Sequence, residues 1–168
     1  MNFSSKFIRA NGDMCDFDRH IPSPYFRKEF ELDFTAEKAE ILICGLGFYR
    51  LWINGTEITK GALAPYISNT GDICYYDLYN IAALLKNGKN VIGVQLGNGF
   101  RNPFGGFVWD FEKMESRGPV CLALTFKAEG GGKELCFEAD ESFKTHASPV
   151  IFDELRMGCR YDARLEIP

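Results

Sequence analysis

The stretch AEILICGLGFYRLWINGTEIT, residues 39–59, decides the fold. It opens with an almost continuous apolar run that reaches Gly47, and the next eight residues place apolar side chains at every second position. A period of two is typical of a strand that buries one face. The pair Asn54-Gly55 then ends this strand, because both positions accept the positive φ angles of a tight hairpin turn. The stretch therefore predicts two strands and a hairpin whose partner strand lies at 56–59.

The same kind of signal recurs along the rest of the chain. Further strands are expected at 26–34, 71–79, 90–97, 119–128 and 133–139. The triple glycine at 130–132 indicates a flexible hairpin tip between the last two. One short helix is expected near 80–87, since Asn80 offers an N-cap and Gly88 a stop signal. Many short strands separated by turns predict an all-β protein, a jelly-roll-like antiparallel β-sandwich with that single short helix.

The chain has 168 residues, a length that corresponds to about one domain. A chain of this size buries roughly 70% of its unfolded surface, which is enough for its own core. We expect a single domain over 1–168, with an extended lead-in at 1–24 and the sandwich at 25–142. The segment 143–168 is expected to be irregular or a terminal strand segment.

Composition argues against several function classes. The net charge is −4 and Lys and Arg form no cluster, which disfavours nucleic acid as a partner. No apolar run approaches the ~20 residues of a membrane span, so no membrane partner is expected. The N-terminus lacks the apolar core of a signal peptide, and the six cysteines are scattered without a C-x-x-C pair. We therefore expect free thiols and a cytoplasmic location.

Candidate catalytic residues are few. Only His20 and His146 could act as an imidazole base, and each lies in a polar stretch where an exposed histidine is the simpler interpretation. Asp110 and Glu112 would share one face if their segment is a strand, and paired carboxylates are what glycoside hydrolysis requires. Neighbouring surface acids are more often only solvated. Dispersed Cys and His give no zinc-ligand spacing. No catalytic residue is therefore predicted.

The segment LGNGFRNPFGGFVWDF, residues 96–111, is the best candidate binding loop. Gly97-Asn98-Gly99 begins like a nucleotide loop, but Asn102 replaces the third glycine and Pro103 stands where the helix should start. Aromatic rings here offer flat faces to sugars, while Asn and Asp oxygens bind hydroxyls. The candidate carbohydrate-binding residues are Trp52, Asn54, Asn98, Asn102, Trp109 and Asp110. The alternatives are that the rings fill the core, or form an apolar patch that contacts a neighbouring domain.

The order of these segments resembles a known family. GLGFYRLWINGTEI is followed by LAPYISNTGDICYYDLYNIAALLKNGKNVIGVQLGNGF and, near the end, by SFKTHASPVIFDELRMGCRYDARLEIP. This order is similar to the N-terminal β-sandwich domain of bacterial α-L-rhamnosidases, the glycoside hydrolase family 78 enzymes. The resemblance covers roughly residues 25–168.

The resemblance implies an accessory domain and not the catalytic part. In that family a separate (α/α)₆ barrel hydrolyses terminal α-L-rhamnosides with inverting acid and base carboxylates. The expected partner is therefore the chain's own catalytic domain, and the chain is expected to be a fragment of a larger enzyme.

The family also offers an alternative function. Some domains of this type are carbohydrate-binding modules that bind rhamnose through calcium, with side chains from the hairpin and from the loop after L-G-[ND]-G-[WF]. Here Asn54 and Asn102 stand in the corresponding places as possible calcium ligands. Gly55 follows Asn54 where a second oxygen ligand is wanted, and Phe100-Arg101 replaces the usual W-Y. No cofactor is predicted outright; rhamnose-containing glycans and calcium remain the alternative.

Overall fold

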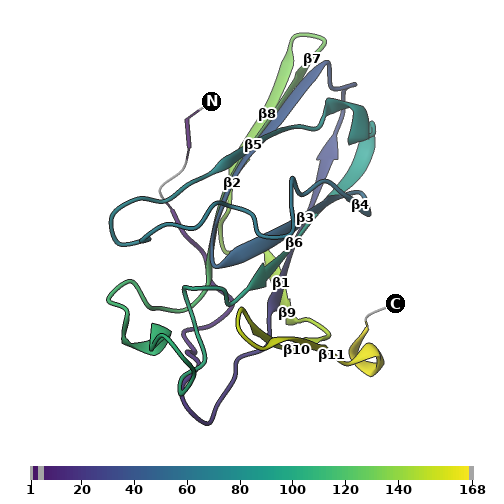
Figure 1. The fold of residues 1–168 in the computed structure, drawn as a ribbon. Coiled ribbons are helices and arrows are strands. Elements are labelled where there is room, and N and C mark those ends of the chain that lie inside the picture. The colour runs from purple at the N-terminus through teal and green to yellow at the C-terminus, as the bar shows by residue number, and fades with distance from the viewer. Residues whose placement is uncertain (1, 4–5, 167–168) are drawn as a thin grey trace.

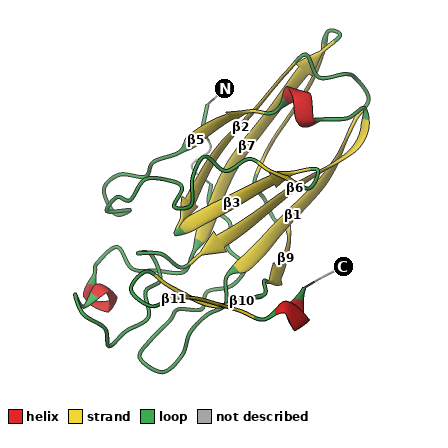
Figure 2. Ribbon diagram, turned by 45° about the vertical axis from the view of Figure 1, so that its right-hand side comes forward, coloured by secondary structure: helices red, strands yellow, loops and turns green. Residues whose placement is uncertain are grey.

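The computed structural model describes residues 2–3 and 6–166, and its regular structure is almost entirely antiparallel strand (Figures 1 and 2). A five-stranded sheet has the order β4-β3-β6-β1-β9, with β4 at Thr56–Glu57, β3 at Phe48–Ile53, β6 at Gly88–Gly97, β1 at Pro24–Leu32 and β9 at Lys144–Ala147. A four-stranded sheet has the order β5-β2-β7-β8, with β5 at Asp77–Asn80, β2 at Lys38–Leu46, β7 at Cys121–Gly130 and β8 at Lys133–Glu138. The hairpin of β10, Val150–Glu154, and β11, Gly158–Tyr161, forms a third, two-stranded sheet.

One hydrophobic core lies between the two large sheets. Alternate residues of each strand point into it, as a period of two requires. Its largest fully buried side chains are Tyr49, Phe26, Phe126, Leu32, Ile41, Ile43, Leu51, Ile53, Ile81, Ile92, Leu96 and Leu122. This arrangement confirms the predicted all-β antiparallel sandwich.

Tyr49 ties the two sheets together through its hydroxyl. The side chain is almost fully buried on β3, and its hydroxyl lies 2.9 Å from the hydroxyl of Tyr79 on β5. The same hydroxyl donates a hydrogen bond to the Asp77 carboxylate, also on β5. The buried Tyr49 hydroxyl therefore has hydrogen-bond partners, as buried polar groups require.

The passage from one sheet to the other depends on Gly47, between β2 and β3. Its φ of +119° is unfavourable for other residues, and a Cβ there would lie 2.2 Å from the carbonyl oxygen of Gly97. The chain therefore crosses between sheets at a point where only glycine fits.

The predicted hairpin is confirmed. Asn54 has φ of 50° and Gly55 has φ of 84°, so both central residues are left-handed, as the turn requires. The partner strand is shorter than predicted, because β4 keeps only Thr56 and Glu57.

Three elements differ in extent or type from the predicted ones. The helix expected near 80–87 is a single 3₁₀ turn, η1 at Ala82–Leu84, whose N-cap is Ile81 and not Asn80. The strand expected at 71–79 is limited to β5, and the preceding residues form a loop. The segment from Phe143 onward, expected to be irregular or a terminal strand, contains β9, β10, β11 and a 3₁₀ turn, η3, at Ala163–Leu165.

The lead-in residues pack onto the sandwich. Ile8 exchanges two backbone hydrogen bonds with Leu122 on β7, each 2.8 Å long. Farther along, the side chains of Cys15 and Ile21 are buried. Within the described residues, no helix has the length and apolar character that crossing a bilayer demands.

Candidate functional site

A buried polar cluster lies where the loop after β6 meets the lead-in and β10. Its centre is Asn98, which is only 2% exposed. The Asn98 amide nitrogen donates hydrogen bonds of 2.7 Å both to the Asp153 carboxylate and to the Ile21 carbonyl oxygen. The Asn98 backbone N–H donates to the other oxygen of Asp153. The amide oxygen of Asn98 accepts from the Asn102 amide at 2.8 Å. All the hydrogen-bonding groups of the Asn98 side chain are therefore engaged within the protein.

Asn102 continues this cluster toward the lead-in. Its side-chain oxygen accepts the backbone N–H of Cys15 at 2.8 Å, and both residues are buried. The Cys15 sulfur accepts the N–H of Ile21 at 3.3 Å. Burial raises the pKa of the Cys15 thiol to about 11, so the thiol stays protonated near neutral pH. A protonated, buried thiol is a poor nucleophile, so Cys15 has a packing role.

Asp153 on β10 is the charged member of the cluster. Besides Asn98, it accepts a hydrogen bond of 3.1 Å from the Ser23 hydroxyl. His20 lies beside it, with Nε2 3.7 Å from a carboxylate oxygen and within 3.2 Å of the Asp153 backbone N and O. Burial raises the pKa of the Asp153 carboxyl, because desolvation outweighs the hydrogen bonds that lower it.

Cysteine, histidine and aspartate together have the composition of a nucleophilic triad, but not its geometry. In the described chain, no hydrogen bond joins the thiol of Cys15 to the ring of His20. The Nε2 atom of His20 is instead directed at the backbone of Asp153. A triad needs the base within hydrogen-bond reach of the nucleophile. The cluster therefore has the geometry of a structural network. The prediction that His20 is exposed is wrong, since its side chain is about 10% exposed; His146 is exposed, as predicted.

The tip of the loop after β6 presents Trp109 and Asp110 to solvent. Trp109 is 70% exposed, and both residues have left-handed backbone angles, with φ of 75° and 46°. Asp110 forms an ion pair of 2.9 Å with Lys113. Asp110 and Glu112 would share a face only if their segment were a strand, and the segment is instead a 3₁₀ turn, η2 at Phe111–Lys113.

Trp52 and Asn54 lie elsewhere, on β3 and its hairpin turn. The Asn54 amide nitrogen donates to the Leu84 carbonyl at 2.8 Å, and its oxygen accepts the N–H of Val91 at 2.9 Å. Val91 and Asn98 are seven residues apart along β6 and its end, which is about 23 Å at ~3.3 Å per strand residue. The six candidate residues therefore fall into separate groups, and Asn54 and Asn102 are too far apart to hold one calcium ion. Among the described residues, no three His, Cys, Asp or Glu side chains are grouped as metal ligands.

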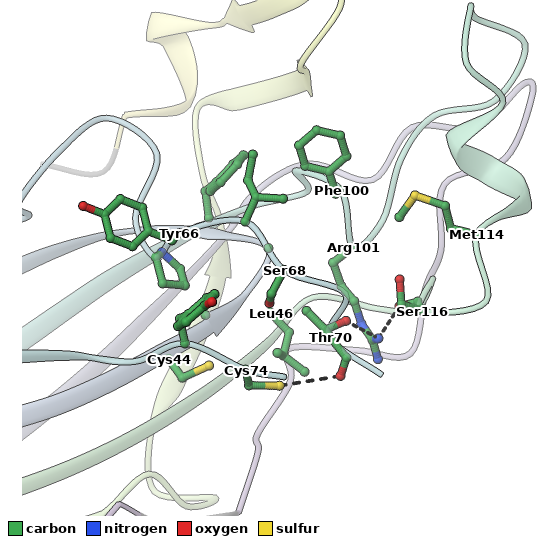
Figure 3. A pocket seen from close by; sticks show the side chains of 16 residues that line it. Cys44, Leu46, Tyr66, Ser68, Thr70, Cys74, Phe100, Arg101, Met114 and Ser116 are labelled. Carbon is green, nitrogen blue, oxygen red and sulfur yellow. Dashed lines mark hydrogen bonds between the residues drawn. The ribbon is translucent and has the colours of Figure 1, made fainter. Parts of the chain in front are cut away.

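A small hollow lies beside Arg101, between β2 and the loops at 65–75 and 100–116 (Figure 3). Its volume is about 30 Å³, whereas small-molecule sites occupy roughly 300–1,000 Å³. The Arg101 guanidinium donates to the Thr70 hydroxyl at 3.1 Å and to the Ser116 carbonyl oxygen. Arg101 thus joins the loop at 65–75 to its own loop at 100–116, and the hollow has room for a water molecule but not for a sugar.

Comparison with known proteins identifies the family. The family model described as the alpha-L-rhamnosidase N-terminal domain matches residues 35–168. The chain belongs to this family. A relative named alpha-L-rhamnosidase from Formosa agariphila is 34% identical over 151 residues, which cover 85% of this chain and 15% of the relative.

Solved structures agree with this family membership. The crystal structure of the alpha-L-rhamnosidase from Aspergillus terreus matches with a TM-score of 0.82 and 28% identity, over 94% of this chain and 18% of that one. The alpha-L-rhamnosidase from Dictyoglumus thermophilum matches with a TM-score of 0.80 and 27% identity, over 96% and 18%. This rhamnosidase N-terminal domain thus spans less than a fifth of the length of these relatives.

Two members of the polar cluster in this rhamnosidase N-terminal domain had no signal in the sequence. Asp153 lies in the segment expected to be irregular or a terminal strand, and Cys15 lies in a polar lead-in more than 130 residues earlier. Only the packing of the lead-in against the loop after β6 brings them to Asn98. The pattern L-G-N-G-F indicated the loop but gave no information on whether its amides face solvent or the interior.

Proposed function

We propose that this chain is the non-catalytic N-terminal domain of an α-L-rhamnosidase. In this proposal it supports or orients a separate (α/α)₆ catalytic domain of the same polypeptide, which hydrolyses terminal α-L-rhamnosides. The observation that carries the proposal is the match to the rhamnosidase N-terminal domain model over residues 35–168. The relatives named alpha-L-rhamnosidase are more than five times longer than the matched region, which leaves room for a catalytic domain.

The chemistry of the buried cluster supports a non-catalytic role. The Cys15 thiol has a raised pKa, and the Asp153 carboxylate is occupied by Asn98 and Ser23. Groups that serve chemistry need access to a substrate, while these groups hold the lead-in and β10 against the sandwich.

Assays with an aryl α-L-rhamnoside test the proposal. The full-length parent protein is expected to release the aryl alcohol, and the 168-residue chain alone is expected to remain at the buffer rate. A parent that lacks residues 1–168 is expected to show a lower thermal midpoint, because its catalytic domain loses a packing partner. Turnover by the chain alone would contradict the non-catalytic assignment. An unchanged thermal midpoint in the truncated parent would contradict the supporting role.

A carbohydrate-binding module for rhamnose is the second candidate function. The observation that favours it is the exposed ring of Trp109 with the Asp110 carboxylate next to it. Sugars stack on exposed rings while nearby oxygens accept hydrogen bonds from their hydroxyls. Calorimetric titration of the chain with L-rhamnose, with and without calcium, tests this function. Trp109→Ala is expected to abolish the heat, and Tyr66→Ala, which removes another highly exposed ring, to preserve it. No heat and no thermal shift for the wild type would eliminate this function.

A further inference from the structure

The outer face of the five-stranded sheet carries a trough with a volume of about 620 Å³, which is within the roughly 300–1,000 Å³ typical of small-molecule sites. The strands β1, β3 and β6 form its floor, and β9 and the end of the described chain form its sides. This is the face opposite the core, and the β10–β11 hairpin crosses one end of the sheet (Figure 2). Residues that line the trough include Tyr25, Arg27, Trp52, Gly93, Lys144 and Tyr161.

The strand register places one row of residues across the trough. Trp52 on β3 lies opposite Gly93 on β6, Gly93 lies opposite Arg27 on β1, and Arg27 lies opposite Lys144 on β9. Gly93 leaves a gap in this row, because a Cβ there would meet only the Trp52 Cβ, at 3.8 Å. Neighbouring strands are about 4.8 Å apart, so Trp52 and Arg27 are separated by about 10 Å. That distance is the length of about two sugar rings.

The aromatic end of the row is held in place. The Arg50 guanidinium lies 5.0 Å from the centre of the Trp52 ring. Glu57 holds this guanidinium through two hydrogen bonds, one of 2.8 Å from Nε. A ring that is already fixed loses little conformational entropy when a ligand stacks against it.

The other end of the row concentrates positive charge. Arg27 and Lys144 are directly opposite each other on neighbouring strands, an arrangement that is unfavourable for like charges without a counter-ion. Glu29 is a partial counter-ion at this end, because it pairs with Arg27 and also feels the charge of Lys144. Glu166 accepts a hydrogen bond from the Tyr161 hydroxyl. Lys144 is exposed, and its ammonium interacts with Glu29 only through charge, with no hydrogen bond to an acceptor in the part of the chain that the structure describes. This end of the trough therefore complements a carboxylate.

We propose that the trough binds a saccharide chain that contains uronic acid, with one sugar ring against Trp52 above Gly93 and a uronate carboxylate at Arg27 and Lys144. Such binding goes beyond the support of a catalytic domain. It also uses a surface that does not include the loop residues Trp109 and Asp110 of the rhamnose hypothesis.

The net charge of the whole molecule argues against unspecific attraction of an acidic ligand to its surface. The chain has a net charge of −4, so a polyanion is repelled on average and is attracted only where cations are concentrated. A ligand that carries both a sugar face and a carboxylate matches both ends of the row. A neutral sugar matches only the aromatic end, and an acidic peptide only the cationic end.

Calorimetric titration of the 168-residue chain tests the proposal with three pentamers: pentagalacturonate, the neutral galactopentaose and pentaglutamate. Pentagalacturonate is expected to bind at least about tenfold more tightly than either of the other two. Lys144→Gln and Trp52→Ala are each expected to weaken its binding about tenfold. Lys133→Gln removes an exposed lysine from the four-stranded sheet and is expected to change nothing. Added L-rhamnose is expected not to compete.

The opposite results would overturn the proposal. Equal binding of pentaglutamate would show that the trough only attracts negative charge and does not recognise a sugar. Equal binding of galactopentaose would show that Arg27 and Lys144 do not contribute to binding. Absence of binding would also overturn it, without bearing on the separate rhamnoside assays of the parent protein. If Trp52→Ala does not fold, Lys144→Gln with an unchanged thermal midpoint decides the question alone.

Discussion

Asn98 shows how one amide can organise three segments that are distant in sequence. It follows β6 directly and contacts Ile21 from the lead-in, Asn102 from its own loop and Asp153 from β10. In a buried site every unmet donor or acceptor costs free energy, and an amide can satisfy two acceptors and a donor at once. The Asp153 carboxylate depends most on Asn98, because Asn98 supplies two of its donors.

Asn98→Ala is expected to lower the free energy of unfolding by about 2–4 kcal/mol, because the side-chain donor to the buried Asp153 and the acceptor for Asn102 are both lost. Urea denaturation at neutral pH measures this change. Asn69→Ala serves as the control, because it removes an amide with only local hydrogen bonds on an exposed loop. The control is expected to cost less than about 0.5 kcal/mol. A loss of similar size in both variants would show that Asn98 does not hold the cluster together.

The roles of Asn98 and Asn102 could not be predicted from the sequence. Their type and position indicated possible ligands for sugar hydroxyls or calcium, and the structure engages them in the interior instead. Asparagine serves both purposes with the same atoms, and only the course of the surrounding chain decides between them. Trp109 and Asp110 lie at the exposed tip of the same loop, so their role as sugar ligands remains a prediction.

At the scale of elements, the crossover from β2 to β3 is the most constrained connection. Gly47 has both a positive φ and a carbonyl oxygen where a side chain would begin, whereas Gly55 has a positive φ and open space around it. Substitution of Gly55 therefore tests backbone strain alone, whereas substitution of Gly47 tests backbone strain together with steric overlap.

Gly47→Ala is expected to cost at least about 3 kcal/mol, since strain and overlap with Gly97 add together. Gly55→Ala is expected to cost only the strain, about 1–2 kcal/mol. Thermal and urea denaturation of the two variants provide the comparison. Equal losses would mean that the backbone at the crossover relaxes at no cost in free energy and does not fix the position of one sheet relative to the other.

Most strands were predictable from the sequence because their alternation was long and one-sided. The hairpin at Asn54-Gly55 was predictable because few residues accept its backbone angles. The short helix near 80–87 was predictable in its place but not in its type, because a short apolar run followed by glycine fits a 3₁₀ turn as well as an α-helix. The Ile81 N–H bonds to the Ala39 carbonyl oxygen at 2.9 Å, a contact with β2 that no local pattern contains. The strands β9, β10 and β11 likewise depend on distant partners or on the packing of the lead-in.

At the scale of the whole molecule, burial of weakly acidic groups links stability to pH. Desolvation raises the pKa of the Cys44 thiol to about 12 and that of Cys15 to about 11. Both values lie above the ordinary thiol range, so the folded state retains protons that the unfolded state releases. The stability that these thiols provide is complete below pH 9 and is lost as the pH rises toward 11–12.

Cys44→Ala is therefore expected to flatten the alkaline loss of stability. Between pH 8.5 and 11 the free energy of unfolding of the wild type is expected to fall by about 2 kcal/mol more than that of the variant. Cys136→Ala, which removes an exposed thiol, is expected to keep the wild-type slope. Urea denaturation at several pH values gives the slopes, and comparison with the wild type cancels the contribution of the buried Tyr49 hydroxyl, whose pKa is also raised. Parallel slopes for the wild type and Cys44→Ala would contradict the proposed origin of the pH dependence.

The outermost strands of the two large sheets have a consequence for the behaviour of the domain at high concentration. On the five-stranded sheet these strands are β4, with two residues, and β9, with four; on the four-stranded sheet they are β5, with four, and β8, with six. Open backbone at a sheet edge invites a second chain to add a strand, which is how many β proteins aggregate. Three of these four edges are too short for such pairing, and the longest, β8, carries Lys133, Glu134 and Glu138. The sandwich therefore resists edge-to-edge polymerisation by the brevity and charge of its margins.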